Sequence, residues 1–591
     1  MNGFRPRRTL ALATPHSAAT DAGRAAFADG GTAVDAALAA CATLTVVYPH
    51  MCSLGGDAIA LVHAPDGIVT CVNGSGAAPA ALDAARVRAA LERDPAPVTR
   101  TGMPQRGPHT VTVPGVLAAW ETLRGSGARH DLARLLRPAI EYARDGCAVS
   151  RSLAGTLAWE PGVFATDPGL RDVFFRGGRP RGGGPGHDPE PLCEGDVFRQ
   201  PALAASLETI ARHGVAAFYE GALGGDFVAG LRALGSLMTV DDLARHATDV
   251  CAPLRHAAFG HEFLTAPPNS QGYVLLQLLA AMELFAVEAE SQSGAVTTPS
   301  SSPTPSLPPD PFGPAAGALA RLFRLASDER DRRLCDPRVH DVPLDELLSP
   351  SHARALARRA GAFGDAAHDG PDALTDGPVG TPGTGPQSDP AAGDTIACVA
   401  ADSDGWGVSV IQSVYNGFGA AILEPSTGIV AHDRGACFSL DPDSPNVVAG
   451  GKRPLHTLMP VMVRRQGRLT IVAGTMGGES QPQIHAQILS RLLRGADAET
   501  TRATAESTPP GDLAGAVAAP RWIYDEGELW AEAGVPAPCL DTLRGTDMSV
   551  TVLDDLDETI GHAQYVFVGE EGPKDATSDP RSDGSSVVTA V

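Results

Sequence analysis

Residues 393–415 read GDTIACVAADSDGWGVSVIQSVY, and this stretch decides the architecture that the rest of the chain must fit. Two β-prone runs, TIACVAA and WGVSVIQSVY, flank the sequence DSDG at 402–405, which is a strong turn signal. We therefore expect a β-hairpin. The turn folds the second run back on the first, so Thr395 and Ser413 are predicted to lie side by side.

The 362–394 segment, immediately before this hairpin, is rich in Gly, Pro and Asp. It carries too little apolar surface to offset the conformational entropy that ordering would cost. The sequence therefore predicts three parts. They are a large segment over residues 1–361, a flexible linker over 362–394, and a smaller segment over 395–591.

The two long segments differ in their hydrophobic periodicity. Before the linker, apolar residues recur mainly at helical spacing, in residues 17–46, 130–146, 200–213, 241–246, 273–286 and 315–333. After it, β-prone runs dominate, at 460–475, 548–553 and 564–568, with one helix expected at 481–494. Helices around a largely antiparallel sheet predict an α+β layered domain.

Composition excludes several classes of protein. The chain has 591 residues, a formal charge of −23 and no basic patch, which argues against nucleic-acid binding. None of its ten cysteines forms a C-x-x-C pair, so no zinc site is indicated. No apolar run has the length of a membrane span or of a signal peptide's apolar region, and we expect a cytoplasmic protein without membrane contact.

Thr395 is the strongest candidate for a catalytic residue. A Thr hydroxyl is a weak nucleophile that needs an adjacent base. If the backbone is cut between Asp394 and Thr395, the new α-amine of Thr395 can accept the hydroxyl proton, and the flexible linker lets the other new end leave. Taken alone, however, a Thr that begins a strand is more often only a β-branched residue in a sheet.

Gly477 and Gly478 lie where a predicted strand gives way to a predicted helix. Backbone N–H groups at such a turn can hold the oxyanion of an acyl-transfer reaction. A strand–helix turn that simply needs glycine is the alternative interpretation.

The chain resembles γ-glutamyltranspeptidases over nearly its whole length. The matching motifs follow the family's order: ATPH at 13–16, GGTAVDAA at 30–37, PH at 49–50, LGGD at 54–57, VTVPG at 111–115, FYEG at 218–221, DERD at 328–331, GDT at 393–395, KRPL at 452–455, MGG at 476–478, APRW at 519–522, GHAQ at 561–564 and DPRSDG at 579–584. The resemblance implies an N-terminal-nucleophile (Ntn) hydrolase. Its expected fold is an αββα four-layer sandwich that both segments form jointly.

The resemblance also implies roles for individual residues. Thr395 matches the catalytic Thr of the family, and the chain is cut after Asp394. Ser413 matches the second hydroxyl that contacts the nucleophile. Gly477 and Gly478 match the pair that forms the oxyanion hole.

Substrate contacts carry over less completely. Asn416 lies one position past the substrate-contacting Asn of the family. His456 and Thr457 occupy the place of a Ser-Ser pair that touches the substrate's carboxylate. Thr457 keeps a hydroxyl, whereas His456 is different chemistry.

Two departures concern specificity for γ-glutamyl groups. Ser75 stands where γ-glutamyl-specific members have an Arg that binds the α-carboxylate, and Cys437 stands where they have an Asp that binds the α-amine. These losses should weaken recognition of an amino-acid head group by several kcal/mol. Arg434 and Arg106 are candidate substitute cations, although such Arg residues are more often solvated surface groups.

We therefore predict an autoprocessed amide hydrolase or acyltransferase whose two fragments stay associated. It would act on a small-molecule acyl donor, with water or an amine as the acceptor and without a metal or cofactor. Cephalosporin-acylase-like enzymes and natural-product-tailoring relatives, including some that split C–C bonds, are alternatives to γ-glutamyl transfer. A non-catalytic homologue is a further alternative, and the intact set of Thr395, Ser413 and the glycine pair argues against it.

Overall fold

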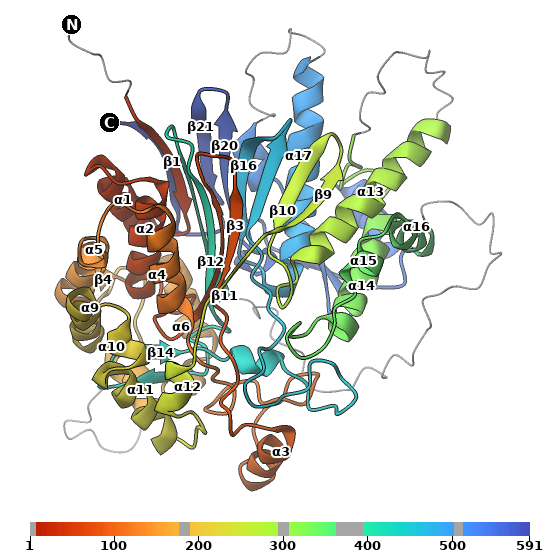
Figure 1. Ribbon diagram of the computed structural model, residues 1–591. Helices are drawn as coiled ribbons and strands as arrows, with labels where there is room; N and C mark the ends of the chain where they lie inside the picture. Colours follow the sequence, from red (N-terminus) through yellow and green to blue (C-terminus); the bar gives the residue numbers. More distant parts are fainter. Residues whose placement is uncertain (1–6, 177–189, 293–306, 362–393, 501–511) are drawn as a thin grey trace, which may run out of the picture.

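The computed structural model describes residues 7–176, 190–292, 307–361, 394–500 and 512–591 (Figure 1). Residues 362–393 of the linker predicted over 362–394 lie outside these residues. Asp394, which the sequence places at the end of the linker, is instead the first residue of strand β11 (Asp394–Asp402).

Two antiparallel sheets form the centre of the molecule (Figure 1). The first has seven strands in the order β22 (Ser585–Ala590), β1 (Thr9–Thr14), β11, β12 (Gly407–Tyr415), β2 (Asp57–His63), β3 (Val69–Asn73) and β8 (Asp249–Cys251). The second has six strands in the order β21 (Gly572–Ser578), β20 (Ala563–Gly569), β16 (Arg468–Thr475), β15 (Val461–Arg465), β10 (His261–Thr265) and β9 (Leu254–Ala258). The hairpin predicted from residues 393–415 is the β11–β12 pair, at the centre of the first sheet.

Helices cover the outer face of each sheet (Figure 1). The first sheet packs against α1 (Ser17–Ala28), α2 (Ala33–Val47) and α4 (Val116–Gly127), and beyond them α5 (Leu132–Asp145) packs on α2 and α9 (Pro201–His213) packs on α5. The second sheet packs against α13 (Gly272–Gln292) and α17 (Gln481–Thr500), and α14 (Ala316–Arg333) and α16 (Pro350–Arg359) pack on α13. A separate apolar layer fills the space between the sheets and includes Leu61, Ala397, Val399, Ile411, Met462 and Val472. The expected α+β fold, an αββα four-layer sandwich, is confirmed.

Strands from both long segments share the first sheet, which the periodicity of the large segment did not indicate. β1 and β2 come from the first 361 residues and pair with β11 and β12, respectively. All seven residues of β2 are buried, as are five of the six of β1. A strand buried on both faces lacks the polar–apolar alternation that marks a strand in sequence. The large and small segments are therefore joined through a continuous hydrogen-bonded sheet.

The remaining elements lie around this sandwich. Shorter helices include α3 (Ala84–Arg93), α6 (Arg151–Trp159), α11 (Ala222–Ala233), α12 (Val240–Ala244), α18 (Leu513–Ala518) and α19 (Ala537–Arg544). The strand predicted at 548–553 is β19 (Ser549–Leu553), and it joins β17 (Trp522–Asp525) and β18 (Glu528–Glu532) in a small separate sheet.

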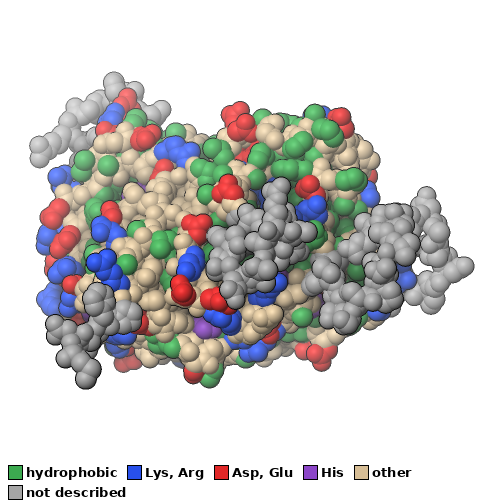
Figure 2. All heavy atoms as spheres, turned by 90° about the horizontal axis from the view of Figure 1, so that it is seen from above, with side chains coloured by type: hydrophobic (Ala, Val, Ile, Leu, Met, Phe, Trp, Pro, Cys, Tyr) green, Lys and Arg blue, Asp and Glu red, His purple; other side chains and the backbone are tan. Residues whose placement is uncertain are grey.

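Charged side chains of both signs are interspersed over the face shown in Figure 2, with apolar side chains scattered between them. This view shows no continuous basic area, in keeping with the net charge of −23. Among the residues that the structure describes, no helix is both long and apolar enough to span a bilayer.

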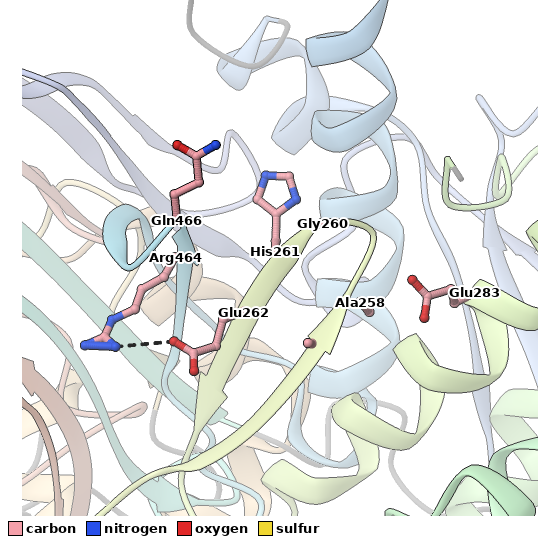
Figure 3. A pocket seen from close by; sticks show the side chains of 8 residues that line it. Ala258, Gly260, His261, Glu262, Glu283, Arg464 and Gln466 are labelled. Carbon is pink, nitrogen blue, oxygen red and sulfur yellow. Dashed lines mark hydrogen bonds and ion pairs between the residues drawn. The ribbon is translucent and has the colours of Figure 1, made fainter. Parts of the chain in front are cut away.

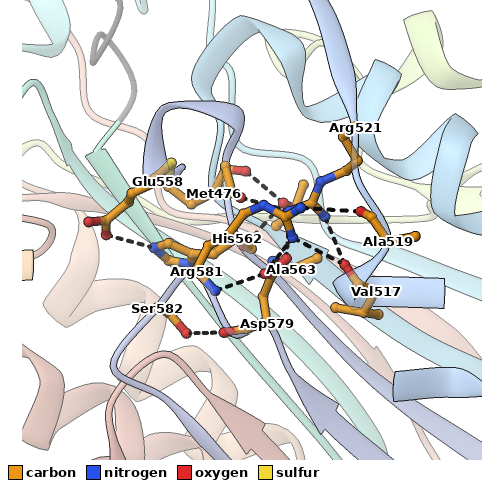
Figure 4. Close-up of polar contacts among 12 residues, drawn as sticks. Met476, Val517, Ala519, Arg521, Glu558, His562, Ala563, Asp579, Arg581 and Ser582 are labelled. Atoms are coloured by element: carbon orange, nitrogen blue, oxygen red, sulfur yellow. Dashed lines mark hydrogen bonds and ion pairs between the residues drawn. The ribbon is translucent and has the colours of Figure 1, made fainter. Parts of the chain in front are cut away.

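A buried ion network ties together two of the motifs near the C-terminus (Figure 4). Arg521 Nη2 donates to Asp579 Oδ2 at 2.7 Å, and Arg581 Nη1 donates to Asp579 Oδ1 at 2.9 Å. Arg581 also pairs with Glu532 at 2.5 Å. All four side chains are fully buried. The APRW and DPRSDG motifs are thus accounted for by packing and ion pairing.

Asp579→Asn is expected to destabilise the fold strongly. It removes the charge that compensates two buried guanidinium groups, a loss that typically costs about 3–5 kcal/mol. The melting temperature should fall well below that of the wild type. Asp21→Asn, at an exposed position on α1, should leave it nearly unchanged. Equal melting temperatures for Asp579→Asn and the wild type would show that the network contributes no stability.

Candidate active site

Thr395 and Ser413 face each other across the β11–β12 pair, as the turn predicted. Thr395 Oγ1 donates a hydrogen bond to Ser413 Oγ over 3.1 Å. The strand register shifts between Asp394 and Thr395, so that Asp394 pairs with Tyr415 while Thr395 pairs with Ser413. The peptide bond between Asp394 and Thr395 therefore lies at an irregularity of an otherwise regular ladder.

Ser413 connects the threonine to the peptide bond before it. Its Oγ donates to the carbonyl oxygen of Asp394 over 2.6 Å. The same Oγ accepts from the backbone N–H of Tyr415 at 2.8 Å and from Arg434 Nη2 at 3.3 Å. With the Thr395 hydroxyl, three donors point at this oxygen and make the Ser413 hydroxyl a better donor in turn, because hydrogen bonds in a chain polarise one another. The Asp394 carbonyl is thus polarised beside the Thr395 hydroxyl.

Gly477 and Gly478 follow strand β16 and adopt backbone angles that favour glycine, with φ of 132° and 49°. Within the described part of the chain, neither backbone N–H donates a hydrogen bond. They therefore have two unused donors at one turn, as an oxyanion hole requires.

The packing of β16 directs this turn toward Thr395. Ala473 accepts from the hydroxyl of Ser409 at 2.7 Å, and Gly474 packs against Ala397 and Ile411. Residue 474 of β16 therefore lies closer to the first residue of β11 than residue 473 does. Continuing in that direction brings residues 477–478 to the end of the sheet where Thr395 lies.

Gln271, just before α13, connects this turn to the second predicted cluster. Its amide Nε2 donates to the carbonyl oxygen of Gly478 at 2.9 Å and to that of Thr457 at 2.8 Å. Its Oε1 accepts from Arg330 Nη1 at 3.2 Å. Gln271 is fully buried, and sequence reasoning missed it because no motif surrounds it.

Arg434 lies in a 3-10 turn, Arg434–Cys437, and only 1% of its surface is exposed. Its Nη1 donates to Thr457 Oγ1 at 3.0 Å and to Cys437 Sγ at 3.6 Å. Its guanidinium lies 4.4 Å from the centre of the Tyr415 ring. With Nη2 on Ser413, this side chain brings Thr457 to the nucleophile. Arg434 is therefore a buried site residue rather than the solvated surface group that was the alternative.

His456 faces away from Thr395, toward Asp57. Its Nε2 lies 3.2 Å from Asp57 Oδ2, and its Nδ1 accepts from the backbone N–H of Leu458 at 3.3 Å. Burial lowers the pKa of His456 to about 3, so the ring is neutral at pH 7. Both nitrogens are occupied, which makes His456 a support for Asp57 in this structure.

Asp57, in the LGGD motif, pairs with Ser413 across β2 and β12. Its Oδ1 accepts two backbone hydrogen bonds, from Gly76 and Gly115. Burial alone would raise the pKa of Asp57, but His432 and His456 oppose this and it falls to about 2. The sequence analysis noted the LGGD motif but predicted no role for Asp57. In the structure, the Asp57 carboxylate holds three segments together beside the site.

Asn416 and Arg106 are engaged in holding the turn after β12. Asn416 donates its backbone N–H and its Nδ2 to the carboxylate of Asp433. Arg106 donates to the carbonyl oxygens of Gly417 and Gly419 and pairs with Glu160 at 3.0 Å. The structure therefore favours Arg434 over Arg106 as a cation for a substrate.

The two positions that depart from the family pattern carry no charge. Ser75 is fully buried, and its hydroxyl donates to Asn73 Oδ1 at 2.7 Å. Burial raises the pKa of the Cys437 thiol, which therefore stays neutral at pH 7.

A surface hollow near the ends of β9, β10 and β15 lies away from this cluster (Figure 3). Two of its acidic side chains are engaged, one with an arginine and one with the backbone. Glu262 pairs with Arg464 at 3.3 Å, and Glu283 accepts from the N–H of Phe259 at 2.8 Å. The hollow lacks the convergent groups found around Thr395.

Comparison with known proteins agrees with this geometry. Residues 19–589 match the model of the family described as Gamma-glutamyltranspeptidase. The chain belongs to the γ-glutamyltranspeptidase family. Its fold and family make it an enzyme of the Ntn-hydrolase kind.

Several relatives in the γ-glutamyltranspeptidase family match over their full length. The chain is 33% identical over 586 residues to the Glutathione hydrolase-like YwrD proenzyme of Bacillus subtilis, covering 98% of each. It is 33% identical over 587 residues to the Oxamate amidohydrolase proenzyme of Klebsiella pneumoniae, covering 97% of each. The crystal structure of cephalosporin acylase from Bacillus halodurans superposes with a TM-score of 0.76 at 28% identity, covering 99% of this chain and 97% of that one. These names span several kinds of amide hydrolysis.

Asp57→Asn is expected to lower the melting temperature at pH 7. The folded-state pKa of about 2 lies below the ordinary value of 3.8, so ionised Asp57 stabilises the fold, by about 2 kcal/mol. This contribution is complete above about pH 4 and is lost as the pH falls toward 2. The difference in melting temperature between wild type and variant should therefore be constant from pH 7 to 5 and shrink below pH 4. A difference that grows on acidification would contradict the assignment.

Proposed function

We propose that this chain is a proenzyme that cuts its own backbone between Asp394 and Thr395 and then hydrolyses amides with Thr395 as the nucleophile. The observation that carries this proposal is the hydrogen-bonded chain from the Thr395 hydroxyl through Ser413 to the Asp394 carbonyl. Nucleophile, proton path and scissile carbonyl are thus adjacent before any cut is made.

Self-cleavage follows from that arrangement. Thr395 Oγ attacks the carbonyl carbon of Asp394 as its proton passes to Ser413. As the adduct collapses, Ser413 delivers a proton to the amide nitrogen and the peptide C–N bond breaks, which leaves Asp394 esterified to the Thr395 hydroxyl and a free α-amine on Thr395. Water then hydrolyses the ester, giving a carboxylate on Asp394 and restoring the hydroxyl.

The mature site repeats this chemistry on an external amide. The α-amine of Thr395 takes the hydroxyl proton as Oγ attacks the acyl carbonyl. The N–H groups of Gly477 and Gly478 hold the oxyanion, and the leaving amine departs with the proton. Water, or an acceptor amine, then releases the acyl group from Thr395. No step in this scheme requires a metal or cofactor.

The acyl donor is best described as an amide whose acyl group lacks an α-amino acid head. Ser75 and neutral Cys437 stand where γ-glutamyl-specific relatives bind the two charges of that head. Relatives named for oxamate and cephalosporin hydrolysis support a broader acyl range. The similarity to cephalosporin acylase also favours a second candidate, tailoring of a natural-product amide.

All ten cysteines are free thiols, which supports a cytoplasmic location.

Self-cleavage is tested on a denaturing gel. The expressed chain should give fragments of roughly 40 and 20 kDa, in proportion to 394 and 197 of the 591 residues in 60.8 kDa. Thr395→Ala should stay full length because it lacks the nucleophile, and Ser413→Ala should be cut more slowly. Edman sequencing of the small fragment should begin at Thr395. Any other N-terminus would refute the nucleophile assignment.

Gly478→Val is expected to reduce turnover by about 10²–10³-fold, the typical cost of losing one oxyanion donor. A β-branched side chain disfavours φ of 49° and would tilt the N–H groups away from the carbonyl oxygen. Gly225→Ala is the matched control, since it replaces a helical glycine with open space around its Cα. A folded and processed Gly478→Val enzyme with normal kcat would remove Gly478 from the oxyanion hole.

Activity on γ-glutamyl-p-nitroanilide is expected to be weak compared with glutaryl-p-nitroanilide, which lacks the α-amino acid head. Without an acidic acceptor for its amine, the γ-glutamyl zwitterion is desolvated at a cost that nothing offsets. The measurement is kcat/KM for both donors on the processed enzyme. A γ-glutamyl preference of a hundredfold would show that the head-group site is rebuilt from other residues.

A further inference from the structure

Arg434 differs from the other large, fully buried arginines. Arg330, Arg521 and Arg581 each form ion pairs with at least one carboxylate. Arg434 is equally buried and forms no ion pair within the described part of the chain. A buried charge without a partner is destabilising, which leaves the folded protein with an unused affinity for an anion.

The hydrogen bonds of Arg434 leave one edge of its guanidinium unpaired, although that edge is buried. A guanidinium has five N–H donors in a rigid fork. Both Nη1 donors are used, on Thr457 and Cys437, and one Nη2 donor is used on Ser413. Nε is buried and has no hydrogen-bond partner. Nε–H and the second Nη2–H remain, and together they match the two oxygens of one carboxylate.

Nearby acidic residues do not fill this place. The carboxylate of Asp433 is bonded by the backbone and side chain of Asn416. Asp57 is held by two backbone N–H groups and by His456. Tyr415 covers one face of the guanidinium. Within the described part of the chain no carboxylate forms an ion pair with Arg434, although its charge acts on both Asp57 and Asp433, so an anion bound at its unpaired edge would be a further partner.

The unpaired edge lies close to the nucleophile. Arg434 Nη2 is 3.3 Å from Ser413 Oγ, which is 3.1 Å from Thr395 Oγ1, so Nη2 and the nucleophile are at most about 6.4 Å apart. A charge-assisted hydrogen bond to a carboxylate takes up about 2.8 Å of this separation. The approach of a nucleophile to a carbonyl carbon takes up about 3–3.5 Å more. If both groups lie in the space between Arg434 and Thr395, the bound carboxylate and the reacting carbonyl are therefore near neighbours in the same molecule.

We propose that the acyl donor is a monoamide of a short dicarboxylic acid, such as oxamic, malonamic or succinamic acid, and that its free carboxylate binds the Nε/Nη2 edge of Arg434. This inference rests on the proposed function, because it places the amide carbonyl of the donor at Thr395. It names a substrate-binding role for Arg434 that the γ-glutamyl site of the family does not require. A longer acyl chain must bend to keep both contacts.

The first measurement compares kcat/KM for the p-nitroanilides of malonic, succinic, glutaric and butyric acids on the processed wild-type enzyme. Malonyl and succinyl donors should be the best, glutaryl weaker, and the neutral butyryl donor lower than succinyl by about a hundredfold or more, since a site built around a polar contact rejects an analogue that lacks it. A glutaryl donor that equals the malonyl donor would overturn the length argument. A butyryl donor that equals the succinyl donor would overturn the carboxylate contact.

The second measurement assigns the contact to Arg434. Arg434→Met should lose the preference for succinyl over butyryl donors through a higher KM, while butyryl turnover falls much less. Arg434→Lys should restore part of the preference, because it keeps the charge without the fork. Arg24→Met, an exposed arginine on α1, is the matched control. A processed Arg434→Met enzyme that keeps the full preference would overturn the assignment.

A wild-type measurement decides the matter if Arg434 variants are not processed. Malonate should inhibit hydrolysis of the butyryl donor competitively, and malonamide, its neutral diamide, should inhibit at least tenfold more weakly. Equal inhibition by the two would refute the carboxylate site. Failure of the proposed function is a separate outcome, in which wild-type chain stays uncut or hydrolyses none of the four donors.

Discussion

The hydrogen bond between Thr395 and Ser413 depends on the β11–β12 hairpin, and so does the rest of the site. The hairpin is central in a sheet that is buried on both faces, so its register cannot slip without moving apolar side chains out of the two cores. The fixed register holds the hydroxyls of Thr395 and Ser413 side by side, and it keeps the Asp394 carbonyl within hydrogen-bonding distance of the Ser413 hydroxyl. Precise local geometry at Thr395 is thus a consequence of global packing.

The second sheet brings the Gly477–Gly478 turn to the candidate site. β16 crosses β11 so that Gly474 packs on Ala397, and the glycine turn that follows reaches the nucleophile's end of the first sheet. Gln271 links that turn to Thr457, and Arg434 links Thr457 to Ser413. The Gly477–Gly478 turn and Thr395 are therefore coupled through one continuous set of buried hydrogen bonds. Such a set limits how far either partner moves during a reaction.

Among the large, fully buried arginines of the described chain, Arg434 differs from the others in having no ion pair. Arg521 and Arg581 are neutralised by Asp579 and Glu532 and serve the fold. Arg434 is surrounded by a hydroxyl pair, a thiol and an aromatic ring, all of them neutral. Ser413 uses one N–H of this cation, and the unpaired edge faces the region of the nucleophile. The unpaired charge of Arg434 next to Ser413 therefore differs from the structural ion pairs of Arg521 and Arg581.

The sequence by itself determined the hairpin, the Thr395–Ser413 pair, the glycine turn and the family, because each of these depends on residues close in sequence or on ordered motifs. It did not determine that β1 and β2 enter the first sheet, since strands buried on both faces carry no alternation. Nor did it separate Arg434 from Arg106, or show that His456 turns to Asp57. Only the tertiary structure decided these, because Arg106 and His456 have partners more than 300 residues away and the partners of Arg434 lie in separate elements that meet only in the fold.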